Sequence, residues 1–255
     1  MTSAILSRTL PDHPDVCRIC LQQSKLTFEH IPPKSCYNKD QLQFYSLHTI
    51  YQRFQGPSKY RKGLGRKSLC MQCNNGIGSK YNSAFKTWTT QAMSLVQRLG
   101  DSANSKFITH PFTIYPGQIA KQIAFMTCAT NDYDIYKAPQ MENLRIIASN
   151  PNTHVRLKNV RVFCYLTLPK STPRLNGICT RIHSGIPIEV VWAEIALAPL
   201  GYVVIAESPT VRKYAYDIGL CDITHFFNYT PIELYSDFLN LRVLNPVGAS
   251  SMQYD

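Results

Sequence analysis

The amino-acid sequence predicts an α+β protein, in which an N-terminal segment held by a metal ion precedes a domain built on a mostly antiparallel sheet. Two Cys-x-x-Cys pairs stand in the first hundred residues, apolar residues recur at helical spacing in the middle of the chain, and segments rich in Val, Ile and Tyr follow residue 160. A chain of 255 residues with 44% hydrophobic content leaves room for two units, which we place at residues 1–100 and 101–255.

The first unit contains one short predicted strand and one long predicted helix. Residues 26–30 alternate in character, which is compatible with a strand, and the two prolines after Ile31 are expected to end it. Apolar side chains recur at three- and four-residue steps over residues 79–99 and predict an amphipathic helix there. Gly100 is expected to stop this helix.

The second unit is expected to begin with helices and to continue with strands. A leading proline and one-sided apolar residues predict a helix over residues 116–128, and a shorter one is expected over residues 140–148. The apolar residues from 232 to 239 suggest a closing helix before Pro246. The segments expected to form the sheet share a high content of Val, Ile and Tyr and are separated by Pro, Gly and Ser. They are residues 160–168, 178–183, 189–196 and 202–206.

Positive charge is concentrated in the first unit. The formal net charge is +11, and residues 1–100 hold 14 Lys and Arg against 4 Asp and Glu, which leaves 13 against 12 for the rest. This local excess suits a polyanionic partner, because each cation near a phosphate releases condensed counterions. A solvated basic face is the alternative interpretation.

The sequence contains no apolar run of eighteen or more residues, and its first fifteen residues lack the features of a secretory signal. We therefore expect a cytoplasmic protein with no membrane partner. In that compartment thiols stay reduced, so metal binding or burial must account for the nine cysteines.

The two Cys-x-x-Cys pairs, Cys17 with Cys20 and Cys70 with Cys73, are the strongest chemical signal. Two residues between cysteines let both thiolates reach one tetrahedral ion at about 2.3 Å, so we expect one structural Zn²⁺. Redox-active or merely buried thiols are the alternatives. The other cysteines lack such spacing and are expected to be small core residues. They are Cys36, Cys128, Cys164, Cys179 and Cys221.

Glu29 and His30 stand side by side on the predicted strand and would point to opposite faces of it. Hydrolysis of a phosphodiester needs a ligand for a hard cation and a group that deprotonates water near neutral pH, and this pair offers both. An isolated Glu-His pair is more often surface polarity or a hydrogen-bonded buried histidine.

The order Cys-x-x-Cys, Glu-His-Ile-Pro and Leu-Cys-x-x-Cys-Asn-Asn over about residues 17–82 resembles the zinc-stapled HNH endonucleases, in particular the phage recombination type. The resemblance implies a ββα-metal, treble-clef-like core in which the four cysteines hold zinc. It implies that Glu29 and Asn74 hold a catalytic Mg²⁺ or Mn²⁺ and that His30 activates the attacking water. Asn75 is an alternative ligand, although a role in the turn is equally expected. The rest of the chain resembles the C-terminal region of uncharacterised bacterial proteins that begin with this HNH motif.

The segment between the cysteine pairs interleaves cations with aromatic residues and has no acidic residue between Gln41 and Cys70. Cations can contact phosphates and aromatic rings can stack on exposed bases, which predicts a nucleic-acid-binding loop. A basic loop with a few packed aromatics is the alternative. The candidate contact residues are Arg53, Lys59, Arg61, Lys62, Arg66 and Lys67.

Together these patterns favour a metal-dependent HNH endonuclease that hydrolyses phosphodiester bonds in nucleic acid. We expect DNA rather than RNA as the substrate, in a phage-related or defence context. The alternative is a non-catalytic zinc module that binds DNA or RNA, joined to a C-terminal domain for a partner or ligand. A homodimer would suit an enzyme that cuts both strands, but the sequence does not fix the oligomeric state.

Overall fold

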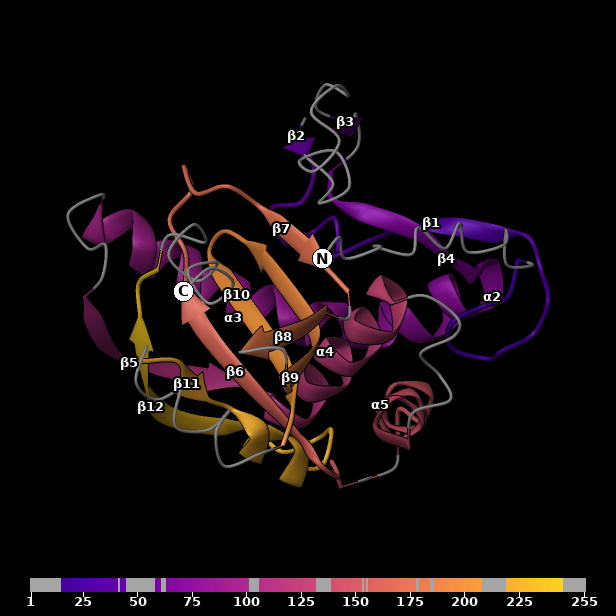
Figure 1. Cartoon of the computed structure of the whole chain (residues 1–255). Helices are drawn as coiled ribbons and strands as arrows, with labels where there is room; N and C mark the ends of the chain where they lie inside the picture. Colours follow the sequence, from indigo (N-terminus) through magenta and orange to yellow (C-terminus); the bar gives the residue numbers. More distant parts are fainter. Residues whose placement is uncertain are drawn as a thin grey trace.

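The structure is a computed structural model of the whole chain (Figure 1). It describes residues 15–40, 42–44, 58–60, 63–100, 106–131, 139–152, 154, 156–177, 179–183, 186–207 and 219–244. The architecture is α+β with mostly antiparallel strand pairing, as the sequence predicts. Within these ranges, no helix combines the length and the apolar character needed to cross a membrane.

The N-terminal part consists of a two-stranded antiparallel sheet followed directly by a long helical segment. Strand β1 (Leu26–His30) pairs with β4 (Gly65–Cys70), which runs straight into the short helix α2 (Met71–Cys73). A π-helical turn, η1 (Asn74–Gly78), connects α2 with α3 (Ser79–Leu99). The strand and the long helix predicted for this part are confirmed with the same bounds.

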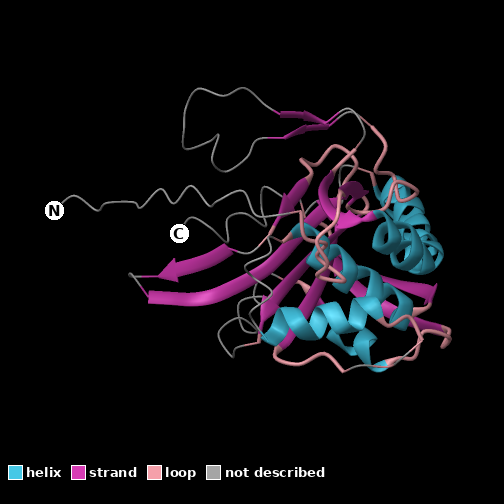
Figure 2. Ribbon diagram, turned by 90° about the vertical axis from the view of Figure 1, so that its right-hand side faces the viewer, coloured by secondary structure: helices cyan, strands magenta, loops and turns pink. Residues whose placement is uncertain are grey.

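A second hairpin lies between β1 and β4 in the sequence. It consists of β2 (Leu42–Phe44) and β3 (Ser58–Tyr60), which pair antiparallel. The hairpin projects from the body of the molecule in both views (Figure 1, Figure 2).

Helix α3 buries one apolar face and exposes a polar one. Its buried residues recur at three- and four-residue steps and include Phe85, Trp88, Ala92 and Val96. The helix ends at Gly100, whose positive φ of 64° suits a residue without a Cβ atom.

The main sheet has six strands in the order β11-β6-β10-β9-β7, with β8 also paired to β9, and all of these neighbours are antiparallel. The predicted strands correspond to β6, β8, β9 and β10, whereas β7 and β11 are too short to give a sequence pattern. The bounds are β6 (Val160–Leu166), β7 (Arg174–Asn176), β8 (Cys179–His183), β9 (Ile186–Leu197), β10 (Leu200–Ala206) and β11 (Cys221–Asp222).

Helix α4 (Pro116–Thr130) is the central helix, and Gln118 is its one residue that is not buried. It packs against α3, against α5 (Pro139–Ser149) and against the 3₁₀ helix η4 (Thr224–Asn228). Figure 2 shows the helices gathered on one side of the long strands. Both helices predicted here are confirmed, and each is slightly longer than its apolar pattern.

The closing helix predicted over residues 232–239 is wrong. Strand β12 (Tyr235–Arg242) occupies this region and pairs with β5 (Phe107–Ile114), a strand that the sequence did not reveal. The burial alternates as in a strand, because Leu239 and Leu241 are buried while Phe238, directly before them, is 63% exposed. The Gln91 side chain of α3 covers the β5 edge, since its amide donates to Thr113 O at 2.8 Å and accepts from Thr113 N at 3.0 Å.

One hydrophobic cluster includes residues from both sides of residue 100. Ile19 and Leu69 of the N-terminal part belong to the same cluster as Phe125 of α4 and Val204 of β10. Gly78 lies at this junction, because a Cβ atom there would stand 2.9 Å from the Phe125 ring. The division into two units at residue 100 stays a sequence-based prediction, and the described residues on either side pack together.

Candidate metal centre

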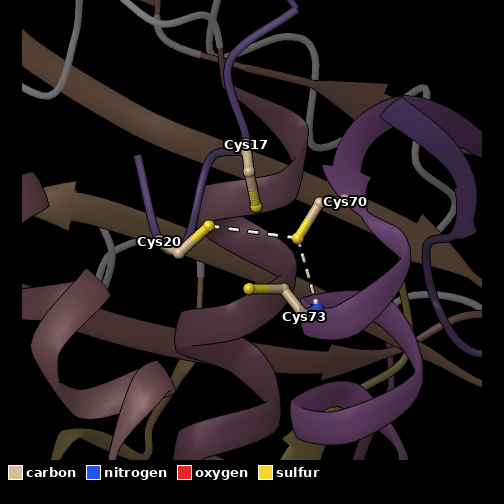
Figure 3. A group of neighbouring side chains, drawn as sticks. All are labelled: Cys17, Cys20, Cys70 and Cys73. Carbon is tan, nitrogen blue, oxygen red and sulfur yellow. Dashed lines mark hydrogen bonds between the residues drawn. The ribbon is translucent and has the colours of Figure 1, made fainter. Parts of the chain in front are cut away.

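The four cysteines of the two Cys-x-x-Cys pairs converge on one point (Figure 3). Their sulfur atoms all lie within 4.8 Å of one another, and Cys20 Sγ is 3.9 Å from Cys70 Sγ. In a tetrahedral site with Zn–S bonds of about 2.3 Å, neighbouring sulfurs are about 3.8 Å apart. The cluster therefore has the geometry and the donor set of a closed structural site and could hold a metal ion such as zinc.

Backbone hydrogen bonds shape the first knuckle. Cys17 N donates to Gln22 O, and Leu21, whose φ is 60°, donates its N–H back to Cys17 O, both at 2.9 Å. An isolated bridge between Val16 and Gln23 closes the turn. The Cys17 and Cys20 thiols consequently point to the same side, toward the second knuckle.

The second knuckle forms where β4 becomes a helix. Cys70 is the last residue of β4 and caps α2, because its Sγ accepts from Cys73 N at 3.4 Å. Arg18 N of the first knuckle donates to Ser68 O of β4 at 3.0 Å, so the two knuckles are also joined through the backbone. Ser68 is the extra residue of a β-bulge, since Thr27 faces Leu69 while Phe28 faces Lys67.

The thiols of the cluster differ in how readily they ionise, because burial raises the pKa of Cys20 while a neighbouring thiol lowers that of Cys17. A hydrogen bond from the Cys73 thiol lowers the pKa of Cys17 to about 4, and the same bond raises the pKa of Cys73. Arg18 is only 7% exposed and donates to Val16 O and Asn131 O, and no carboxylate among the described residues pairs with it. The two backbone carbonyl oxygens therefore accept from the buried guanidinium in place of a carboxylate.

Glu29 and His30 lie on opposite faces of β1, as alternation requires. Glu29 is 9% exposed, whereas His30 is half-buried and its ring meets Phe28 edge-on with centroids 5.1 Å apart. Burial raises the pKa of Glu29 to about 8. Among the described residues, no cation or hydrogen-bond donor reaches the Glu29 carboxyl. In the register with β4, Glu29 faces Arg66 and His30 faces Gly65. A Cβ atom on Gly65 would lie 2.0 Å from the backbone oxygen of Glu29.

Asn74 contacts the strand that carries this pair, because its side chain reaches back from η1 to β1. Its Nδ2 donates to Thr27 Oγ1 at 3.0 Å and to Phe28 O at 3.2 Å. Thr27 Oγ1 in turn donates to Leu69 O at 2.9 Å. Phe28 O can only accept, so the amide nitrogen must face the strand, and Oδ1 is left without a donor among the described residues.

The basic residues predicted to bind nucleic acid separate in the structure. Arg66 is half-buried and donates from Nη1 to Thr130 O at the end of α4, at 2.6 Å, while Lys67 is exposed. Of Lys59, only the backbone in β3 is described. The predictions for Arg53, Arg61 and Lys62 fall outside the described residues.

Asn38 is a positioning residue that the sequence did not reveal. It is fully buried, donates to Pro32 O and Leu64 O, and accepts from Leu64 N, each at 2.6 Å. These bonds hold the chain directly after His30 against the chain directly before Gly65. An asparagine in a turn-rich segment gives no signal of such a role.

The other described cysteines lie outside this cluster. Cys36, Cys128 and Cys164 are buried, as expected for core residues, and Cys221 is half-buried opposite Cys164 in the register of β11 and β6. Within the described ranges, Cys17, Cys20, Cys70 and Cys73 are the one set of three or more His, Cys, Asp and Glu side chains close enough to share an ion. No family model, no curated protein and no solved structure matches this chain.

Proposed function

We propose that the protein is a metal-dependent HNH-type endonuclease that hydrolyses phosphodiester bonds in nucleic acid. The observation that carries the proposal is the bond from Asn74 to Phe28 O, which fixes the second cysteine knuckle to the strand that bears Glu29 and His30. A strand pair followed by a helix, with cysteines at the helix start, is also the arrangement that the sequence resemblance implies.

In this proposal, Glu29 and the Oδ1 atom of Asn74 would hold a hard divalent cation. Glu29 is a buried carboxyl without a cationic partner among the described residues, and burial without a counter-charge opposes ionisation. Carboxylate and amide oxygens are the ligands that Mg²⁺ and Mn²⁺ prefer. When bound there, such an ion would neutralise charge that develops on the phosphate and the leaving oxygen.

His30 is the proposed general base. It accepts a proton from a water molecule, whose oxygen attacks the phosphorus while the bond to the leaving oxygen breaks, and that oxygen then takes a proton from solvent. His30 is half-buried and on the opposite face of β1 from the buried Glu29, so its ring is accessible to water. Phe28 packs edge-on against the ring and limits its rotation.

The test compares plasmid cleavage by the wild-type protein and by His30→Ala, in Mg²⁺ or Mn²⁺. We expect cleavage by His30→Ala to fall by about 10²–10⁴-fold while its zinc content and melting temperature stay unchanged. His225→Ala is the matched control, because His225 is exposed on η4 and lies outside both β1 and the cysteine knuckles. Full cleavage by His30→Ala, in preparations free of other nucleases, would refute the mechanism. Duplex binding without any cleavage by the wild-type protein would favour the non-catalytic zinc module.

A further inference from the structure

The exposed face of α3 has an unusual composition for a surface helix. Its 21 residues include three cations and no Asp or Glu, and its exposed side chains are hydroxyls, amides and cations. Surface helices normally mix charges of both signs. A face that carries only hydrogen-bond donors, hydroxyls and positive charge suits an anionic partner.

The cations at the two ends of this face point the same way. Lys80 and Arg98 are eighteen residues apart, which is about five helical turns and about 27 Å along the axis. The exposed hydroxyls between them follow three- and four-residue steps, so they lie on the same side as both cations. They are Ser83, Thr87, Thr90 and Ser94.

At the Arg98 end, this face opens into a groove of about 580 Å³ between α3 and β5. Its lining includes Arg98, His110 and Gln97 and contains no carboxylate among the described residues. No acidic group in the described ranges pairs with Arg98, and the ring of His110 contacts Phe112 at 5.0 Å between centroids. Partial burial and the charge of Arg98 lower the pKa of His110. Arg98 and His110 therefore line one groove whose described lining offers no carboxylate to pair with them.

We propose that this groove and the exposed face of α3 form a second contact surface for the phosphodiester backbone of a nucleic acid. Arg98 and His110 bind a phosphate at one end of the surface, and Lys80 binds another phosphate at the end near the cysteine cluster. The hydroxyls of α3 contact the nucleic-acid backbone between them. The inference rests on the proposed function for the identity of the partner, and it assigns residues outside the predicted basic loop.

The length of the surface favours a nucleic acid over a small anion. A span of about 27 Å corresponds to about eight base-pair steps along the axis of a duplex, at about 3.4 Å per step. A free phosphate or a nucleotide would need the groove alone, and nothing would then require the carboxylate-free face that continues to Lys80.

The experiment measures binding of a fluorescent 30-base-pair DNA by anisotropy over a series of salt concentrations. The full chain carries His30→Ala, which keeps the DNA intact. Adding Arg98→Gln should weaken binding about threefold to tenfold and reduce the slope of log affinity against log salt by about one. Lys80→Gln should act similarly. Arg156→Gln removes an exposed charge far along the chain in the second unit and should change neither quantity.

The outcomes distinguish failure of this inference from failure of the proposed function. DNA binding that has a normal salt slope and is unaffected by Arg98→Gln would overturn the inference alone. A shift of the His110 ring signals by inorganic phosphate but not by DNA would also overturn it and assign the groove to a free anion. Loss of binding in Arg98→Gln, in a protein that never cleaves DNA, would keep the inference and reject the nuclease. Absence of any DNA binding would overturn both.

Discussion

Replacing Asn74 tests whether the second knuckle holds β1 in place. Asn74 makes two half-buried hydrogen bonds to β1, at 3.0 and 3.2 Å. Each such bond contributes about 0.5–1.5 kcal/mol net, so Asn74→Ala should reduce the free energy of unfolding by about 2 kcal/mol. For a chain of this size, that loss lowers the melting temperature by roughly 4–8 °C.

Asn74→Asp is the sharper variant, because a carboxylate keeps the shape and the Oδ1 ligand but has no hydrogen to donate. It would face Phe28 O, which can only accept, and should destabilise the protein at least as much as Asn74→Ala. If Oδ1 holds the divalent ion, Asn74→Asp should still cleave DNA faster than Asn74→Ala once Mg²⁺ is raised.

Asn75→Ala is the matched control for both variants. Asn75 is the exposed neighbour, and within the described ranges its side chain makes no hydrogen bond, while its backbone oxygen accepts from Ser79 Oγ at 2.6 Å. Urea unfolding of zinc-loaded protein gives the comparison. If Asn74→Asp were as stable as the wild type to within about 0.5 kcal/mol, the bonds from Asn74 would not hold β1. If Asn75→Ala lost cleavage instead, the ligand would be Asn75.

Two further predictions concern metal removal and pH. The purified protein should contain about one equivalent of zinc, and chelation or Cys73→Ser should abolish hydrogen-exchange protection around residues 15–36 and 64–75; full protection in metal-free protein would contradict a structural site. Burial lowers the pKa of Lys121 from 10.5 to about 8, a difference of about 3 kcal/mol. The charged form is penalised in the folded state, so the penalty is complete below pH 8 and disappears as pH rises to 10.5. Between pH 8 and pH 10.5, the free energy of unfolding of the wild type should therefore rise relative to that of Lys121→Met. If urea unfolding showed the same difference between the two proteins at every pH, the buried charge of Lys121 would not destabilise the fold.

Local patterns predicted the elements that local forces decide. The helix over residues 79–99 could be bounded because apolar spacing and Gly100 both act within a few residues. The cysteine pairs were predictable for the same reason, since two intervening residues already place two thiols on one side of a turn.

Strands β5 and β12 were missed because their partner decides their structure. Each lies more than a hundred residues from the other in sequence, and both carry apolar residues on the exposed face, such as Phe107 and Phe238. Exposed apolar residues hide the alternation that marks a half-buried strand. In residues 232–239 they also imitate the spacing of a helix, which produced the wrong prediction.

The candidate site was predictable in its residue types but not in its surroundings. No sequence pattern indicates that Glu29 is buried without a described counter-charge, or that the Arg66 guanidinium donates to Thr130 O. The Arg66 contact depends on how α4 packs against β4. Arg18 shows the same limit, because a cation inside a Cys-x-x-Cys pair is usually solvated, and here it is buried against Asn131 O.

These contacts connect the proposed chemistry to the cysteine cluster by a defined route. The first knuckle holds the bulge of β4 through the bond from Arg18 N to Ser68 O, and the second holds β1 through Asn74. At the end of the strand pair near the cluster, one knuckle holds β1 and the other holds β4. At the opposite end, next to His30, Asn38 holds the two chain segments together. Loss of the metal would release the cluster end and leave Asn38 in place. It should therefore change the position of Glu29 more than that of the residues after His30, and a cysteine variant should lose divalent-ion affinity before it loses DNA binding.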